Sequence, residues 1–370
     1  MNRRLLAAVL TLLGASALVL GLRFRGAPST PASGLPSRPW IDEPAAGPLS
    51  WSVSPGATEV RLHLTVGGRS RSLRSGNLGA TFSPSEETPA PPLPPGVSPV
   101  PLGSLALRGS SGPVAVGRDS EGRGVLLYGG TTQLRREAPA GELVAAFQEG
   151  GPRLLLKRKA GTGFVELVLA SVPGEDGPWG AESSAEVSYV SELAMPSGPE
   201  RSCGLPDERY ASLVGVGTKD AALIAVGPKA IHAYRFHATP GARYSVVCGS
   251  CPPMVLESRN DGLGLFVPVR RNLSPARIAV PPTFEPGRSD RSAVGACTMS
   301  RTAVIYEAGG KLLVQEREAG SWRFGAPRVV AETDARGAPI EPALLGVGDA
   351  LVAVWRRKIE GRLLLEAATL

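Results

Sequence analysis

Four cysteines are the side chains with the most definite chemistry in this chain: Cys203, Cys248, Cys251 and Cys297. An even number of cysteines in an exported protein predicts disulfide bonds, and four cysteines allow three different pairings. Cys248 and Cys251 also have the C-x-x-C spacing of a redox-active pair, in which a thiolate pKa is lowered. That motif normally opens a helix in an α/β fold, and no helical pattern surrounds it here. We therefore predict structural disulfides.

Two histidines shortly before these cysteines raise the alternative of a zinc site. Zinc prefers four nitrogen and sulfur ligands in a tetrahedral arrangement. His232 and His237 are separated by an odd number of residues, which places them on opposite faces of a strand. Their order relative to Cys248 and Cys251 is also the reverse of a usual zinc finger. The sequence therefore predicts no metal site.

Other catalytic signatures are missing from the sequence. The chain has only 3 histidines and no Gly-x-Ser-x-Gly motif, so a serine hydrolase is not indicated. Its glycines punctuate turns and do not form a phosphate-binding loop. We predict no catalytic residue and no cofactor.

The composition limits the fold that must position these residues. The 370 residues are 42% hydrophobic and 20% charged, with 46 glycines and 35 prolines. This is too apolar for a disordered chain, and prolines along most of its length exclude a largely helical protein. The formal net charge is +7, but the basic residues are interspersed with acids and form no stripe with aromatic side chains. No nucleic-acid partner is therefore expected.

The N-terminus predicts export. A basic head at residues 1–4 is followed by an uncharged apolar run at residues 5–22. Residues 1–25 are therefore interpreted as a helical signal peptide or an uncleaved signal anchor, and the sequence leaves both open. The expected location is periplasmic, anchored to the cell envelope or secreted. Any membrane contact would be made through this segment alone.

Two proline-rich segments divide the rest of the chain. Residues 26–50 are interpreted as an extended linker, and residues 83–101 as a stiff connector within the folded part. Between and after them, apolar runs of four to six residues alternate with Gly, Pro and Asp. This pattern is typical of many short antiparallel strands. The body, residues 51–370, is predicted to be all-β.

Several strands recur at a regular spacing. Residues 175–181 (EDGPWGA) and 318–326 (EAGSWRFGA) share an acid, a glycine and a tryptophan two residues after that glycine. The separation of Trp179 and Trp322 along the sequence corresponds to three units of about 48 residues each. This is a usual length for a propeller blade. Cys248 and Cys297 fall at equivalent positions of successive units and are expected on adjacent inner strands.

The last unit is one strand short of a four-stranded blade. We expect a strand from the N-terminal part to complete it, either near Trp40, near Trp51 or at residues 59–65, because a ring of sheets needs protected edges. The tryptophans at the repeated positions, Trp322 and Trp355, are expected in the core, with stacking on a sugar as the alternative.

The turn Gly-x-Trp, the following Gly-Ala-Pro, the Pro-Ala-Leu at residues 342–344 and the run at residues 351–355 (LVAVW) resemble blades of the sialidase-type (BNR-like) β-propeller superfamily. The resemblance is best over residues 291–370. It implies a β-propeller of six or seven blades, each a four-stranded antiparallel sheet. The Asp-box of that superfamily is intact nowhere. Its enzymes use an arginine cluster, a tyrosine–glutamate pair and a further acid, none of which a local motif places here.

Two functions remain as hypotheses. The first is an exported, non-catalytic and monomeric propeller that binds a protein, a peptide or a glycan. The alternative is a sialidase-like glycoside hydrolase acting at the mouth of the propeller channel. Carboxylates for such chemistry fall in or near predicted loops, namely Asp119, Glu121, Asp207, Glu208, Asp290 and Glu341. The absence of any placed catalytic set favours the binding module.

Overall fold

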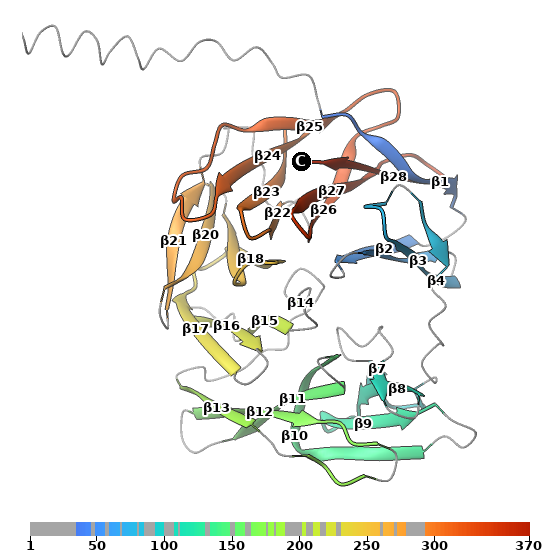
Figure 1. Cartoon of the computed structure of the whole chain (residues 1–370), viewed down its shortest axis with the longest axis vertical. Helices are drawn as coiled ribbons and strands as arrows, with labels where there is room; N and C mark the ends of the chain where they lie inside the picture. Colours follow the sequence, from blue (N-terminus) through green and yellow to red (C-terminus); the bar gives the residue numbers. More distant parts are fainter. Residues whose placement is uncertain are drawn as a thin grey trace, which may run out of the picture. The chain divides into compact units, whose positions relative to one another are not determined.

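The regular elements of this chain are β-strands (Figure 1). The computed structural model describes residues 35–370 except for 46–48, 56–58, 67–68, 80, 85–92, 100–106, 110–111, 130–133, 149–151, 160–163, 175–176, 181–182, 189–201, 205–209, 215–219, 227–230, 260–261, 270–271 and 279–292. Within these residues no helix occurs, so the predicted all-β class is confirmed. None of the described residues forms a helix of membrane-spanning length and hydropathy.

Most of the strands are short, as the apolar runs predict, and β10 is the longest of them. In the first half of the chain they are β1 (Arg38–Pro44), β2 (Leu49–Pro55), β3 (Val60–Val66), β4 (Arg69–Ser75), β5 (Ser83–Pro84), β6 (Ser98–Pro99), β7 (Leu107–Gly109), β8 (Gly112–Arg118), β9 (Arg123–Tyr128), β10 (Leu134–Gln148), β11 (Pro152–Lys159), β12 (Phe164–Ser171) and β13 (Ser183–Ser188).

In the second half they are β14 (Ser202–Gly204), β15 (Tyr210–Val214), β16 (Asp220–Val226), β17 (Ile231–His237), β18 (Arg243–Gly249), β19 (Met254–Arg259), β20 (Gly262–Val269), β21 (Asn272–Ile278), β22 (Ala293–Cys297), β23 (Arg301–Ala308), β24 (Lys311–Glu318), β25 (Arg328–Glu332), β26 (Pro339–Val347), β27 (Ala350–Arg357) and β28 (Arg362–Thr369).

The predicted N-terminal elements fall differently. The proposed signal or anchor helix, residues 1–25, and the first part of the proposed linker lie outside the described residues. Residues 38–44, from the same proline-rich stretch, form β1. The proposed connector, residues 83–101, contains β5 and β6 near its ends.

The last unit of the chain is completed by its first strand. The four strands lie in the order β1-β28-β27-β26, with β1 antiparallel to β28 from Arg38↔Ala367 to Pro44↔Arg362. Of the three candidate segments, the one around Trp40 supplies this strand, so that expectation is confirmed. The Trp40 ring is buried and packs edge-on against Phe82, at 5.2 Å between ring centroids.

Most of the other strands also pair in consecutive antiparallel groups. One four-stranded sheet has the order β2-β3-β4-β5, and an eight-stranded sheet contains β6 to β13. A twelve-stranded sheet joins β14–β17, β18–β21 and β22–β25. The groups within it meet through two short parallel contacts, β17 with β21 and β18 with β22. Each group is therefore a local antiparallel meander that touches its neighbour at one edge.

The core lies between neighbouring sheets. In β27 the run at residues 351–355 is buried at every position. Successive side chains point to opposite faces of the strand, and both faces are covered. Leu351, Ala353 and Trp355 pack with the β22–β25 side, whereas Val352 and Val354 pack with residues of β3 such as Leu62 and Leu64. A strand covered on both faces has no polar side, which explains the continuous apolar runs in the sequence.

The backbones of three strands approach one another closely where β18, β22 and β26 end. A Cβ atom on Gly249 would lie 1.8 Å from the carbonyl oxygen of Cys297, and one on Gly346 would lie 2.2 Å from that oxygen. Only glycine allows backbones this close. The first strands of three successive groups therefore converge at one point.

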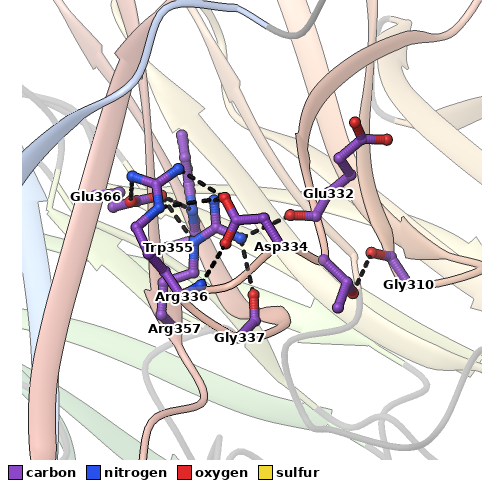
Figure 2. Close-up of polar contacts among 9 residues, drawn as sticks. Gly310, Glu332, Asp334, Arg336, Gly337, Trp355, Arg357 and Glu366 are labelled. Carbon is purple, nitrogen blue, oxygen red and sulfur yellow. Dashed lines mark hydrogen bonds and ion pairs between the residues drawn. The ribbon is translucent and has the colours of Figure 1, made fainter.

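A buried ionic network fixes the last sheet. Glu366 is fully buried and accepts hydrogen bonds at Oε2 from Trp355 Nε1 at 3.0 Å and Arg357 Nε at 2.8 Å, and Arg336 binds its Oε1 (Figure 2). Arg357 Nη1 also donates to the carbonyl oxygens of Glu332 at 2.7 Å and Gly337 at 3.0 Å. The network thus ties β27 and β28 to the segment between β25 and β26.

We predict that Glu366→Ala lowers the free energy of unfolding by about 3–5 kcal/mol, because it leaves the guanidinium of Arg357 buried without its carboxylate. The measurement is denaturant unfolding. Asp42→Ala is the matched control, because it removes the exposed partner of Arg362 in the same sheet and should cost less than about 1 kcal/mol. Equal effects of the two substitutions would contradict the structural importance of the network.

Candidate functional site

A disulfide joins Cys251 to Cys297, with 5.8 Å between their Cα atoms. Cys251 follows β18 and Cys297 ends β22, so the bond links two of the converging strands. Cys251 is therefore not paired with Cys248, as a redox-active C-x-x-C pair would require. Cys248 lies beside Ala296 in the parallel β18–β22 contact, so the expectation of adjacent strands holds for their backbones. The sulfur atoms of Cys203 and Cys248 lie outside the described part of the structure.

The histidines considered for zinc lie on β17. His232 and His237 are both exposed, and the His232 ring stacks on Tyr234 with 6.4 Å between ring centroids. Among the described residues, no group of three or more His, Cys, Asp and Glu side chains is arranged to hold a metal ion.

Three connections lie at the end of the sheets where the disulfide is found. Because β22 to β25 are antiparallel, the turn β22–β23 and the loop β24–β25 (residues 319–327) emerge at the same end. The amide of Ala319 donates to the carbonyl oxygen of Ser300 at 2.7 Å, which joins the two connections directly. The amide of Ser250 donates to the carbonyl oxygen of Cys297 at 3.2 Å and attaches the β18–β19 connection to them.

Two large hydrophobic side chains are exposed at this end of the β22–β25 sheet. Met299, in the β22–β23 turn, is 70% exposed, and Trp322, in the β24–β25 loop, is 53% exposed. Among the described residues they are the only large hydrophobic side chains with this degree of exposure. We call the two residues and Arg323 the Trp322 face.

The exposure of Trp322 contradicts the expectation that both repeated tryptophans lie in the core. Trp355 is fully buried, as predicted, but Trp322 is not. The reason lies in the matched turn at Trp179, which is partly buried with the guanidinium of Arg136 5.9 Å from its ring centroid. In the later turn Arg317 instead lies over Phe324, at 5.6 Å. In the later turn the arginine thus covers Phe324, and Trp322 is left exposed.

The backbone contacts of the two turns support this comparison. Arg136 Nη1 donates to the carbonyl oxygens of Gly174 at 3.0 Å and Gly177 at 2.9 Å. Arg317 Nη1 donates to the carbonyl oxygen of Ser321 at 2.9 Å. In both turns an arginine holds turn carbonyls and stacks on an aromatic ring, although Arg317 comes from the strand before its turn and Arg136 comes from β10.

Of the carboxylates proposed for glycoside chemistry, the described ones are Asp119, Glu121 and Glu341, and they lie in two different environments. Asp119 and Glu121 lie in the β8–β9 turn, where Asp119 Oδ1 accepts the amides of Glu121 and Arg123, each at 2.9 Å. Asp207, Glu208 and Asp290 lie outside the described residues. The Asp119 contacts are those of a turn-forming aspartate and give it a structural role.

Glu341 is found in a different environment, at an irregularity of β26. It is a non-glycine residue with a φ of 53°, a left-handed conformation that is costly for a side chain of this size. Its amide donates to Glu307 Oε1 at 3.2 Å, and Arg356 lies 3.7 Å from its carboxylate. Burial raises the pKa of Glu307, and the negative charge of Glu341 acts in the same direction. The pair holds the irregular strand in place.

One tyrosine–glutamate pair lies in the β18–β19 hairpin. The Tyr244 hydroxyl donates to Glu257 Oε1 at 2.8 Å and accepts the amide of Thr239 at 2.6 Å. Both side chains are buried, and burial together with Glu257 raises the pKa of Tyr244 to about 12. A tyrosine that acts as a nucleophile needs the opposite, a hydroxyl that loses its proton easily and faces solvent. This pair is therefore part of the core.

Comparison with known proteins identifies no family. No family model matches the chain, and no curated protein matches it. Solved structures with a similar backbone include a prolyl endopeptidase (TM-score 0.43, 13% identity over 83% of this chain), of which the chain covers 45%.

Two further similar structures are matched over most of their own length. The lectin of Aleuria aurantia has a TM-score of 0.33 and 15% identity, with 78% of this chain and 96% of the lectin covered. The WD40 domain of SCAP from fission yeast has a TM-score of 0.41 and 9% identity, with 91% and 90% covered. At these scores the similarity assigns neither a family nor an activity to this chain.

Of the three pairings that four cysteines allow, only one contains the Cys251–Cys297 bond, and its other bond joins Cys203 to Cys248. These two residues lie on β14 and β18, which contact each other. We predict that peptide mapping of the non-reduced protein recovers both bonds and no free thiol. A free Cys203 or Cys248, or a Cys203–Cys251 peptide, would contradict this pairing.

We predict that Glu307→Gln stabilises the protein at pH 7.5 but not near pH 4. The folded state raises the pKa of Glu307, so this carboxyl favours folding while it is protonated and loses that contribution as the pH rises through its folded pKa. The side-chain oxygen of the glutamine still accepts the hydrogen bond from the backbone amide of Glu341. The expected rise in unfolding temperature at pH 7.5 is about 1–2 °C. Glu318→Gln at an exposed position is the control, and an equal rise at both pH values would count against this cause.

Proposed function

We propose that this chain is an exported, non-catalytic β-propeller that binds a protein, a peptide or a glycan through the Trp322 face. The observation that carries the proposal is the exchange of aromatic partners in the repeated turn. Arg317 stacks on Phe324, and Trp322 is exposed, whereas Trp179 in the matched turn is partly buried beside Arg136. Exposed tryptophan is costly in water and is enriched among the residues that dominate binding energies.

The strand pairing supports a propeller of seven blades. Five four-stranded groups are β2–β5, β14–β17, β18–β21, β22–β25 and β26–β28 with β1. The remaining sheet supplies two more, because β10 pairs with β9 through its first half and with β11 through its second. The first strands of neighbouring groups contact one another, namely β14 with β18, β18 with β22 and β22 with β26. This is the arrangement expected around a central channel.

The sequence and the disulfide support the proposed export of the protein. A basic head and an apolar run at residues 1–22 suit an export signal or anchor. A disulfide at the converging strands suits an oxidising compartment. The sialidase-like alternative gains no support from the tyrosine–glutamate pair, which is buried with a raised tyrosine pKa.

The test is a binding screen of the exported protein against an immobilised glycan array and a displayed peptide library. We expect Trp322→Ala to weaken the binding of the selected ligands by about tenfold or more, the effect of removing a central aromatic contact. Lys358→Ala is the control, because Lys358 is exposed in the β27–β28 turn at the opposite end of the sheets. Ligands that bind Trp322→Ala as tightly as the parent, or turnover of chromogenic glycosides, would overturn the proposal.

A further inference from the structure

Arg317 lies beneath the loop that carries Trp322. It lies near the C-terminal end of β24, and its guanidinium makes three contacts. Nη1 donates to the carbonyl oxygen of Ser321 at 2.9 Å, and the planar group lies over the ring of Phe324 at 5.6 Å. Nη2 lies 3.2 Å from the sulfur of Met254, at the start of β19 in the neighbouring group of strands. One side chain thus connects the loop to two groups of strands.

The remainder of the loop is fastened on both sides of Trp322. The amides of Ala319 and Gly325 donate to the carbonyl oxygens of Ser300 at 2.7 Å and Glu316 at 2.8 Å. Phe324 packs against the core cluster shared by β18–β21 and β22–β23, and Cys251 packs against the same cluster. Trp322 and Arg323 lie between these attachments, and both are exposed.

The contacts of Arg317 are unusual for a cation. Burial lowers its pKa, and among the described residues no carboxylate pairs with it. A partly buried cation without an acidic partner is costly, so hydrophobic packing alone would be served better by methionine or leucine. What arginine adds is the planar group that binds a carbonyl and stacks on a ring at once.

Among the described residues, a second arginine makes the same two kinds of contact. Arg136 holds the carbonyl oxygens of Gly174 and Gly177 and lies over Trp179. There the ring that stacks is the tryptophan itself, so that turn presents no exposed aromatic residue. The two sites differ in the ring that the arginine covers: Trp179 in the first turn, and Phe324 in place of Trp322 in the second.

We propose that Arg317 is the positioning residue of the Trp322 face: it holds the 319–327 loop in one conformation so that the indole of Trp322 is already ordered before a ligand arrives. This inference rests on the proposed function for the role of Trp322. A side chain ordered in advance loses less conformational entropy on binding, which raises affinity without adding a contact.

The test uses Arg317→Met and Arg317→Lys in the exported protein, with Arg136→Met as the matched control. Trypsin cleaves after Arg323, which is exposed, so the rate of cleavage between Arg323 and Phe324 reports the order of the loop. We expect Arg317→Met to accelerate this cleavage by about tenfold, the loss of one charge-assisted hydrogen bond and one stacking contact. Arg317→Lys should give a smaller acceleration, and the unfolding temperature should stay within a few degrees of the parent.

Acrylamide quenching of Trp322, taken as the difference between each protein and its Trp322→Phe form, supplies a second measure. Arg317→Met should raise the quenching, and Arg136→Met should change neither the quenching nor the cleavage after Arg323. Unchanged cleavage in both Arg317 variants, or equal acceleration by Arg136→Met, would overturn the inference. A third outcome separates this inference from the proposed function. If Arg317→Met accelerates the cleavage but the selected ligands bind Trp322→Ala as tightly as the parent, Arg317 still anchors the loop and only the binding role of Trp322 is overturned.

Discussion

The antiparallel pairing of β1 with β28 is the interaction on which the rest of the structure depends. It joins residues from opposite ends of the chain, as the Asp42–Arg362 ion pair illustrates. Closing so long a loop costs conformational entropy, but the cost rises only slowly with length. Once β1 is in place, β28 has partners on both sides, and Leu363 and Leu365 are buried with Trp40 in one core cluster.

A second constraint acts where the first strands of neighbouring groups meet. Gly249 and Gly346 allow two backbones to approach the carbonyl oxygen of Cys297. The disulfide from Cys251 adds a covalent link at the same point. Loops that emerge beside such a junction start from a rigid base, which is the usual arrangement for residues that bind ligands. The Trp322 face emerges there.

The repeated turn shows how one local motif serves two purposes. An arginine under the turn holds its carbonyl oxygens in both copies. At Trp179 the stacking ring and the repeated tryptophan are the same residue, and the turn is purely structural. At Trp322 a second aromatic residue two positions later, Phe324, occupies the stacking position. In the later turn one aromatic residue, Phe324, supports the loop and another, Trp322, is exposed. This difference distinguishes it from the turn at Trp179.

Sequence alone determined the class of this protein. Apolar runs bounded by Gly and Pro predict strands because backbone alternation and turn chemistry are local properties, and the missing fourth strand of the last unit followed from counting. Tertiary structure decided the rest. Glu366 finds Arg336 only because β28 lies beside the segment before β26, and Cys251 bonds Cys297 because β18 and β22 are parallel neighbours. Trp322 was expected in the core because it lies at a repeated position that matches Trp179. Packing between strands decides which ring an arginine covers. The spacing of residues in the sequence does not show that contact.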